Sequence, residues 1–402
     1  MPELVAHGLL AGLEEIAGTG RDPRAGGYSR HLWEPADHEL RAWFTERAER
    51  LGLAVEVDRN GNTWAWWGAP GADAVVLGSH LDSVPGGGAY DGPLGVVSAL
   101  DAVARLQAEG FAPGRPCAVL VFAEEEGSRF GVACLGSRLL AGAIDPDVAR
   151  SLTDRSGVTL AEAAVTAGLN PAHLGRDQPA LDRIGIFLEL HVEQGRSLID
   201  LGEPLAVASS ILAHGRWRLS FTGQGNHAGA TLMSDRRDPM VAAAHGIVAV
   251  QQAALASPGA RATVGRIEAV PGGTNVIPSA VHAWLDARAE TDAQVRAVVA
   301  DISGRLQAPH TDCSAAVVEE SWTSTVTFDP ELAARLAQTL GGIPALPTGA
   351  GHDAGVLAAR VPTAMLFVRN PTGISHSPEE FATLADCLAG VEALQTVLRE
   401  LL

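Results

Sequence analysis

The residues best suited to chemistry in this chain come at the ends of apolar runs. His80 ends the run "AVVLGSH", and Asp82 follows two residues later. Three glutamates occupy positions 124–126 after "AVLVFA", His191 lies in "FLELHV", and His376 comes after "TAMLFV". Buried carboxylates are costly unless they are paired or bind a metal, so three successive glutamates there are hard to explain by packing. Mixed histidine, aspartate and glutamate ligation suits zinc, manganese or cobalt.

The glycine-rich stretch "GSHLDSVPGGGAYDGPLG" (78–95) connects His80 to a second aspartate, Asp91. Glycines in such a stretch can serve a phosphate loop, a metal site or an ordinary turn. All 29 basic residues of the chain are arginines, which excludes the lysine of a phosphate loop and Schiff-base chemistry. We therefore interpret the stretch as half of a metal site, in which the glycines at 86–88 let Asp91 return to the same crevice.

Other catalytic motifs are missing or weak. The sequence contains no G-x-S-x-G, which weakens an α/β-hydrolase interpretation, and no H-E-x-x-H, which excludes a helix-borne zinc protease. "GQGNHA" (223–228) and "GAGHDA" (349–354) fit G-x-G-x-x-A, but neither opens a strand–helix–strand unit with a suitably placed acid. Dinucleotide binding is therefore not expected.

The composition is that of a globular protein. With 402 residues, 47% of them apolar and 19% charged, the chain can bury a sizeable core and form two or three domains. Its formal net charge of −18 argues against nucleic acid or an anionic membrane surface as a partner. The four scattered cysteines indicate reduced thiols and a cytoplasmic protein. The N-terminus lacks a basic signal-peptide region, and no run of 18 apolar residues predicts a membrane span.

The elements that must position these residues alternate between strands and helices. We expect a helix at 40–53, a hairpin at 54–67, strands at 74–80, 116–126 and 184–195, and a helix at 95–110. Continuous apolar strands separated by helices predict an α/β fold with a parallel or mixed sheet and helices on both faces. In such a sheet the carboxyl ends of the strands converge on one crevice, which would gather the histidines and carboxylates.

The pattern changes from about residue 211 to residue 325. Strands expected at 214–223, 262–270, 280–290 and 313–321 alternate with helices at 238–256 and 291–307. This βαββαβ order predicts a ferredoxin-like, four-stranded antiparallel sheet with two helices, inserted into the first domain. We therefore expect a discontinuous catalytic domain (1–210 and 326–402) and an inserted domain (211–325).

Seven motifs occur in an order that resembles a known family. They are "GSHLDSVPGGGAYDGPLG", "EEEGSRF", "LELHVEQG", "NHAGAT", "GGTNVIP", "GAGHDA" and "GISHSPEE". The chain is similar to the zinc aminoacylase/carboxypeptidase-G superfamily, and within it to the amidase/hydantoinase/carbamoylase family. That family includes N-carbamoyl-L-amino-acid hydrolases, allantoate amidohydrolases, ureidoglycolate amidohydrolases and β-ureidopropionases. The resemblance covers nearly the whole chain and implies a zinc exopeptidase-like catalytic domain.

The resemblance implies a site for two divalent metal ions, zinc first, with manganese or cobalt as alternatives. Asp91 would bridge the metals, Asp82 would orient the His80 ring, and Glu125 would be the general base. Adjacent side chains at a strand end point in different directions, which would let Glu125 face the water while its neighbour binds metal. One metal would also bind His80 and His191, and the other Glu126 and His376.

The inserted domain would act as a lid and as a homodimer contact. The resemblance implies that His227 stabilises the oxyanion and, with Asn275, contacts the substrate, while Arg288 grips a carboxylate of the substrate. The resemblance also implies that Gln194, Gly351 and His352 contact the substrate. For His352 the alternative is a structural role. Leu232, Thr348 and the segment "SSILAHG" differ from common family residues, which bears on substrate preference and leaves the metal ligands intact.

Three functions remain open at this point. The first is a ureido amidohydrolase acting on a small carboxylate, allantoate or an N-carbamoyl-L-amino acid, with allantoate slightly favoured. The second is an aminoacylase or dipeptidase of the same superfamily. The third, from another class, is a non-catalytic binding protein stabilised by metal.

Overall fold

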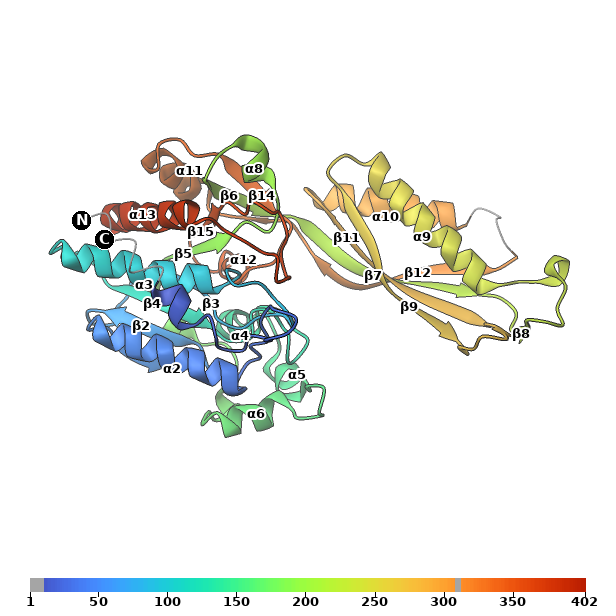
Figure 1. Cartoon of the computed structure of the whole chain (residues 1–402), viewed down its shortest axis with the longest axis horizontal. Helices are drawn as coiled ribbons and strands as arrows, with labels where there is room; N and C mark the ends of the chain where they lie inside the picture. The colour runs from blue at the N-terminus through green and yellow to red at the C-terminus, as the bar shows by residue number, and fades with distance from the viewer. Residues whose placement is uncertain (1–10, 308–311) are drawn as a thin grey trace. The chain divides into compact units, whose positions relative to one another are not determined.

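The computed structural model describes residues 11–307 and 312–402. The expectation about a signal peptide concerns the chain's first segment, much of which lies outside the described residues. The chain divides into two compact units (Figure 1). Unit 1 comprises residues 1–210 and 327–402, and unit 2 comprises residues 211–326.

A mixed sheet forms the centre of unit 1. Its strand order is β1-β2-β4-β3-β5-β15-β6-β13, and β14 pairs with β6. The four middle strands β4, β3, β5 and β15 run parallel, whereas β2 runs antiparallel to β4 and β6 runs antiparallel to β15. The strands are β1 (Ala54–Val57), β2 (Thr63–Trp67), β3 (Ala74–His80), β4 (Cys117–Phe122), β5 (Ile184–Val192), β6 (Leu205–Ile211), β13 (Val326–Thr327), β14 (Ala345–Thr348) and β15 (Thr363–Val368).

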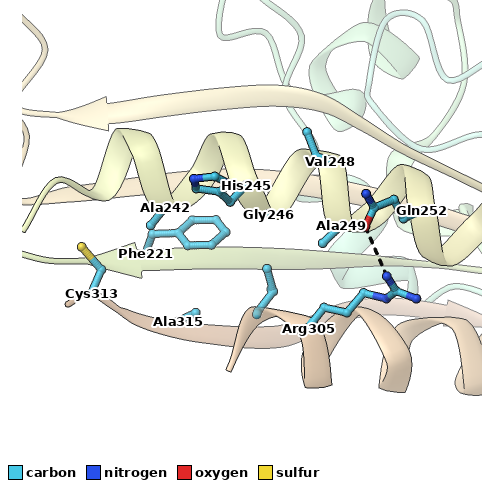
Figure 2. Close-up of a pocket in the computed structure, with 11 residues that line it drawn as sticks. Phe221, Ala242, His245, Gly246, Val248, Ala249, Gln252, Arg305, Cys313 and Ala315 are labelled. Carbon is cyan, nitrogen blue, oxygen red and sulfur yellow. Dashed lines mark hydrogen bonds between the residues drawn. The ribbon is translucent and has the colours of Figure 1, made fainter. Parts of the chain in front are cut away.

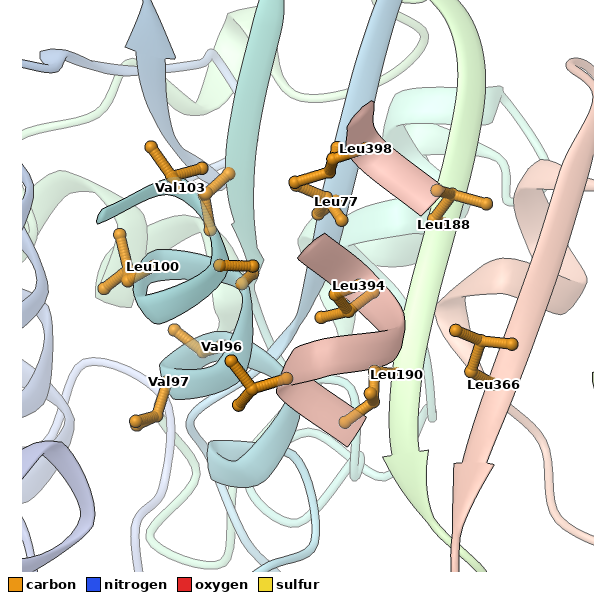
Figure 3. Close-up of a cluster of buried hydrophobic side chains, with 14 of the residues drawn as sticks. Leu77, Val96, Val97, Leu100, Val103, Leu188, Leu190, Leu366, Leu394 and Leu398 are labelled. Carbon is orange, nitrogen blue, oxygen red and sulfur yellow. The ribbon is translucent and has the colours of Figure 1, made fainter. Parts of the chain in front are cut away.

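Helices cover both faces of this sheet, which confirms the predicted mixed α/β fold. On one face, α2, α3 and α13 join the strands in a single apolar cluster; Figure 3 shows Leu394 and Leu398 of α13 beside Leu77, Leu188 and Leu190. Helices α4 and α12 pack against each other outside that cluster. The helices are α2 (Pro35–Arg50), α3 (Pro93–Ala108), α4 (Leu135–Ala141), α5 (Pro146–Ser151), α6 (Leu160–Thr166), α7 (Gln178–Leu181), α8 (Ser197–Leu201), α11 (Pro330–Thr339), α12 (Asp353–Leu357) and α13 (Leu384–Leu401).

Unit 2 is an antiparallel sheet of order β12-β7-β11-β9 with two helices packed on it. Side chains of β11 alternate between buried and half-buried along the strand, as expected for a sheet covered on one face. A small second sheet pairs β8 with β10. The elements are β7 (Ala213–Thr222), β8 (Asn226–His227), α9 (Pro239–Ala256), β9 (Arg261–Val270), β10 (Val276–Ile277), β11 (Ala280–Ala289), α10 (Asp292–Leu306) and β12 (Ser314–Thr323).

Helix α9 bears on the expectation that no segment is long and apolar enough to span a membrane. It has 18 residues and a mean hydropathy of 1.3, long and apolar enough to cross a membrane by length and composition. In unit 2 it begins at the N-cap Asp238, whose side chain accepts from the Met240 N–H, and it packs on β7, β9 and β11. Its small residues, among them Ala243 and Gly246, form the buried side.

Two predicted strands are too long, and one of them is the strand expected at 184–195, which ends at Val192. β4 ends at Phe122, and the glutamates at 124–126 lie in the turn that follows, not on the strand. Glu124 has a φ of 54°, a left-handed conformation that a strand does not contain. The expected alternation of a strand end therefore does not separate Glu125 from Glu126; the turn does.

Candidate functional site

The ends of β3 and β5 bring two histidines together in unit 1. His80 is the last residue of β3 and His191 lies near the end of β5, and both are fully buried. Their ring centroids are 5.8 Å apart. Each Nδ1 is hydrogen-bonded to a backbone carbonyl, that of Asp82 for His80 (3.0 Å) and that of Val192 for His191 (2.9 Å). These bonds orient both Nε2 atoms toward the same point.

Asp91 lies between these histidines and a third one. Its Oδ1 is 3.5 Å from His80 Nε2 and 3.2 Å from His191 Nε2, whereas its Oδ2 is 3.3 Å from His376 Nε2. Burial acts to raise the pKa of Asp91, but the three neighbouring histidines hold it well below its ordinary value. Asp91 is thus a carboxylate whose two oxygens face two different groups of potential ligands.

The second group contains Glu126 and His376. His376 Nε2 is 3.6 Å from Glu126 Oε2, and one ligand atom from each of Asp91, Glu126 and His376 lies within 4.8 Å of the others. His376 has a φ of 56°, an uncommon conformation for a histidine, and its side chain is about half exposed. The structure therefore places all five predicted ligands in two groups that share Asp91.

The donor set fits divalent metal ions. Among the described residues, Nε2 of His80 and Nε2 of His191 are buried without a hydrogen-bond partner. Buried polar atoms in this position are costly unless something satisfies them. Three imidazoles and two carboxylates are ligands that zinc, manganese and cobalt accept.

Asp82 acts on three neighbours at once. Its Oδ1 is 3.5 Å from His80 Nδ1, farther than its own backbone carbonyl, so the carbonyl makes the closer contact with the ring. The Asp82 carboxylate also accepts the backbone N–H groups of Glu125 (3.2 Å) and Glu126 (3.0 Å). Asp82 therefore orients the turn after β4 as well as the His80 ring.

Glu125 is buried next to the predicted metal ligands. Its Oε2 is 3.7 Å from His80 Nε2, and its Oε1 accepts from the Cys134 thiol at 3.5 Å. Burial and nearby carboxylates raise the pKa of Glu125 well above its ordinary value, against the opposing charge of His80. One oxygen of this carboxylate is thus held, and the other faces the ligand cluster.

Glu124 binds the backbone of the loop that follows β4. Its Oε1 accepts the N–H groups of Arg129 and Phe130, both at 2.7 Å, which closes the loop "EGSRF". Burial first, and the charge of Asp82 second, raise its pKa to about 8.

The predicted substrate contacts of unit 1 are Gln194, Gly351 and His352, and they lie at different distances from Asp91. Gln194 Nε2 donates to Asp91 Oδ2 (3.0 Å), so Gln194 belongs to the cluster. His352 is 2% exposed, and its ring lies 4.5 Å from that of His191. Glu189, His191 and His352 form a third group of close potential ligands. Gly351 is exposed beside His352.

The predicted lid residues lie in two separate places within unit 2. His227 and Asn275 are neighbours: His227 pairs with Val276 across β8 and β10, and the Ala228 N–H donates to the Asn275 carbonyl (3.0 Å). Arg288 lies near the far end of β11, where it forms a two-pronged ion pair with Asp286 (2.7 and 3.1 Å).

Several residues around the cluster were not anticipated from the sequence. Cys134 contacts Glu125, and Ser137, one turn further on, donates to Asp353 (2.5 Å). Glu189 accepts from Ser79 (3.0 Å) and from the backbone of α12. Glu380 binds the loop that carries Asp91. The only sequence signal for Glu380 was its place in "SHSPEE", four residues after His376.

A pocket of about 340 Å³ lies elsewhere, in unit 2, and contains none of the predicted site residues. Figure 2 shows it between α9, α10 and the strands, with Phe221 and His245 at one part of its wall and Arg305 at another. Arg305 donates to Gln252 (3.2 Å) and to Asp301 (3.0 Å), so this guanidinium is already paired within the unit.

Known proteins resemble this chain over most of its length. Residues 76–400 match the family described as Peptidase family M20/M25/M40. N-carbamoyl-L-amino acid amidohydrolase from Geobacillus stearothermophilus is 36% identical over 95% of both chains, and allantoate amidohydrolase from Escherichia coli K12 is 32% identical over 96% of this chain and 95% of its own.

Solved structures show the same relationship. The crystal structure of an amidase of the hydantoinase/carbamoylase family from Burkholderia multivorans superposes with a TM-score of 0.86 at 30% identity, covering 98% of this chain and 97% of its own. That of AtUAH in complex with glyoxylate gives a TM-score of 0.83 at 31% identity over the same shares. The resemblance found in the sequence is confirmed: this chain belongs to Peptidase family M20/M25/M40, in its branch of hydantoinase/carbamoylase amidases.

Proposed function

We propose that this protein is a metal-dependent amidohydrolase that cleaves the ureido C–N bond of a small carboxylate and releases ammonia and carbon dioxide. The observation that carries the proposal is the Asp91 cluster, in which two groups of ligands share one carboxylate. Relatives named for N-carbamoyl-L-amino acids, allantoate and ureidoglycolate point to the ureido group as the substrate feature. Zinc is the expected metal, and manganese or cobalt are the alternatives.

In the proposed mechanism Glu125 moves the proton. Two divalent metals held by the five ligands would lower the pKa of a water and polarise the ureido carbonyl. Glu125 takes the proton of the attacking water and returns it to the leaving nitrogen. Because Oε1 is engaged by Cys134, Oε2 is the oxygen that receives the proton. Expulsion of ammonia leaves a carbamate, which releases carbon dioxide and the free amine.

His227 would hold the developing negative charge. Its Nδ1 accepts the Gly229 N–H (3.1 Å), so the proton of the neutral ring resides on Nε2. An Nε2–H donor is what an oxyanion requires. Arg288, with its guanidinium oriented by Asp286, would bind the substrate carboxylate.

Ammonia release is the measurement that tests this function. We expect ammonia from at least one of allantoate, ureidoglycolate, N-carbamoyl-methionine and β-ureidopropionate when the protein is supplied with zinc, manganese or cobalt. The same assay with dipeptides and N-acyl amino acids should show no comparable turnover. Release of amino acids from dipeptides without any ureido turnover would instead support the aminoacylase or dipeptidase alternative.

The length of the sheet in unit 2 bears on how the lid would act. Ala280 to Arg288 alone spans about 27 Å at the rise of an antiparallel strand. Ala280 pairs with Thr222, the last residue of β7, and β8, which carries His227, follows β7 in the chain and lies at this end of the sheet (Figure 1). A small ureido acid is much shorter than this. One copy of unit 2 therefore cannot supply both Arg288 and the His227–Asn275 pair to one substrate, and a second copy would have to supply one of them.

An apolar stripe on α9 is suited to such a dimer contact. Val241, Val248 and Leu255 repeat every seven residues and are 44%, 50% and 79% exposed. Residues spaced by seven lie on one side of a helix, and contiguous exposed apolar side chains mark interaction surfaces. We propose that two lids meet along this stripe in a homodimer.

A complementation experiment tests the shared site. The variants Glu125→Gln and His227→Ala should each be nearly inactive alone. When they are co-refolded in equal amounts, half of the dimers are mixed and each carries one intact site, so about a quarter of wild-type activity should return. Absence of any recovery in demonstrated mixed dimers would place His227 in the same subunit as its catalytic cluster.

A further inference from the structure

Glu380 connects the two loops that carry the shared ligand and the most exposed ligand. Its Oε1 accepts the backbone N–H groups of Tyr90 (2.9 Å) and Asp91 (3.0 Å), although 289 residues separate it from Asp91. Its Oε2 accepts from Ser375 Oγ (3.3 Å), which is also 3.4 Å from Asp91 Oδ2. The side chain is only 4% exposed, so water does not compete effectively for these bonds.

Neighbouring residues pack closely around the Glu380 carboxylate. A Cβ at Gly88 would lie 2.2 Å from Glu380 Oε1, so any side chain there would displace the carboxylate. The neighbouring Tyr90 and Phe381 rings meet edge to face at 6.2 Å, which joins the same two loops by an apolar contact. Gly88 therefore allows Glu380 to approach this loop closely. This role adds to the one predicted from the sequence, in which the glycines at 86–88 let Asp91 return to the crevice.

His376 needs such a support. It is the one ligand of the five whose side chain is about half exposed, and its left-handed φ of 56° is a conformation that non-glycine residues hold only when their surroundings enforce it. Its loop is attached to the Asp91 loop through Ser375 and Glu380.

We propose that Glu380 is a positioning residue that sets the spacing between Asp91 and His376, and thereby the retention of the metal bound by Asp91, Glu126 and His376. The other group, His80 and His191, is rigid by itself because both histidines are buried on strands. Loss of Glu380 should therefore weaken the binding of a metal by Asp91, Glu126 and His376 much more than the binding of the other metal. This inference rests on the metal site of the proposed function.

The test counts metal ions per chain after gel filtration and measures affinity by competition with a chelator. Wild type should retain two ions, whereas Glu380→Gln should retain one, with affinity for the second lowered about 10- to 100-fold. Gly88→Ala should show the same loss, because it displaces the carboxylate while leaving Glu380 in the chain. Matched controls are Glu379→Gln, at the exposed neighbour, and Gly304→Ala, which has open space around it.

The outcomes separate this inference from the proposed function. Two ions held at wild-type affinity by both variants would overturn it, as would equal loss of both ions with a lower melting temperature of the metal-free protein. Selective loss of one ion supports it even if no ureido substrate is turned over, in which case only the proposed reaction fails. A wild-type chain that binds no divalent metal would refute the metal site and this inference together.

Discussion

Replacement of Glu125 by glutamine should lower kcat by about 10²- to 10⁴-fold, the range over which a general base contributes. Glutamine keeps the shape of the side chain and the contact with Cys134 but cannot take a proton. None of the five expected ligands changes, so the metal content should remain that of wild type. The measurement combines the ammonia assay with metal analysis of the same preparation, and the exposed Glu46→Gln serves as the control.

A Glu125→Gln variant with wild-type kcat would show that another group accepts the proton. Loss of metal together with activity would assign Glu125 to the ligands, because the defect would then be one of binding. The non-catalytic binding protein predicts a third result: metal bound by wild type and variant alike, with no turnover by either.

Replacement of Asp91 by alanine should abolish detectable turnover and remove both metals. Its Oδ1 faces His80 and His191, and its Oδ2 faces His376, so one side chain serves both groups of ligands. Among residues 11–307 and 312–402, Asp91 is the residue that belongs to both of these groups of potential ligands. Metal analysis should therefore fall from two ions per chain to less than one.

The Asp91→Ala variant is compared with Glu125→Gln to separate loss of metal from loss of proton transfer. Both variants should be inactive, but only Asp91→Ala should lose metal. The control Asp301→Asn, which breaks an exposed ion pair with Arg305, should leave both activity and metal unchanged. Retention of one tightly bound ion by Asp91→Ala would show that the two groups of ligands do not depend on a shared carboxylate.

Much of the fold was predictable because it follows from local patterns. The buried strand β3 was predicted from an apolar run ending at His80, and the helix predicted at 238–256 is α9. The mixed sheet with helices on both faces follows from apolar strands alternating with helices. The end of β4 was not predictable in this way, because the left-handed turn at Glu124 depends on Asp82 and on the "GSRF" loop, both of which act through hydrogen bonds.

The residues that surround the Asp91 cluster were the hardest to predict from the sequence. Cys134 looked like an ordinary buried thiol, and it is the fold that places its Sγ 3.5 Å from Glu125. Glu380 was not among the predicted site residues, yet it is buried against Asp91. In each case the partner is a side chain or backbone group that only folding brings near, and no periodicity of the chain records such a contact.

By itself the sequence determined which residues are candidate ligands, that most of them follow apolar strands, and the family to which the chain belongs. Those properties depend on residue identity and on short-range pattern, which the chain carries locally. Only the tertiary structure decided that both oxygens of Asp91 face histidines, that Asp82 orients the glutamate turn, and that Glu380 joins loops 289 residues apart. These depend on distances of a few ångströms between distant segments, and such distances are set by how the whole sheet and its helices pack.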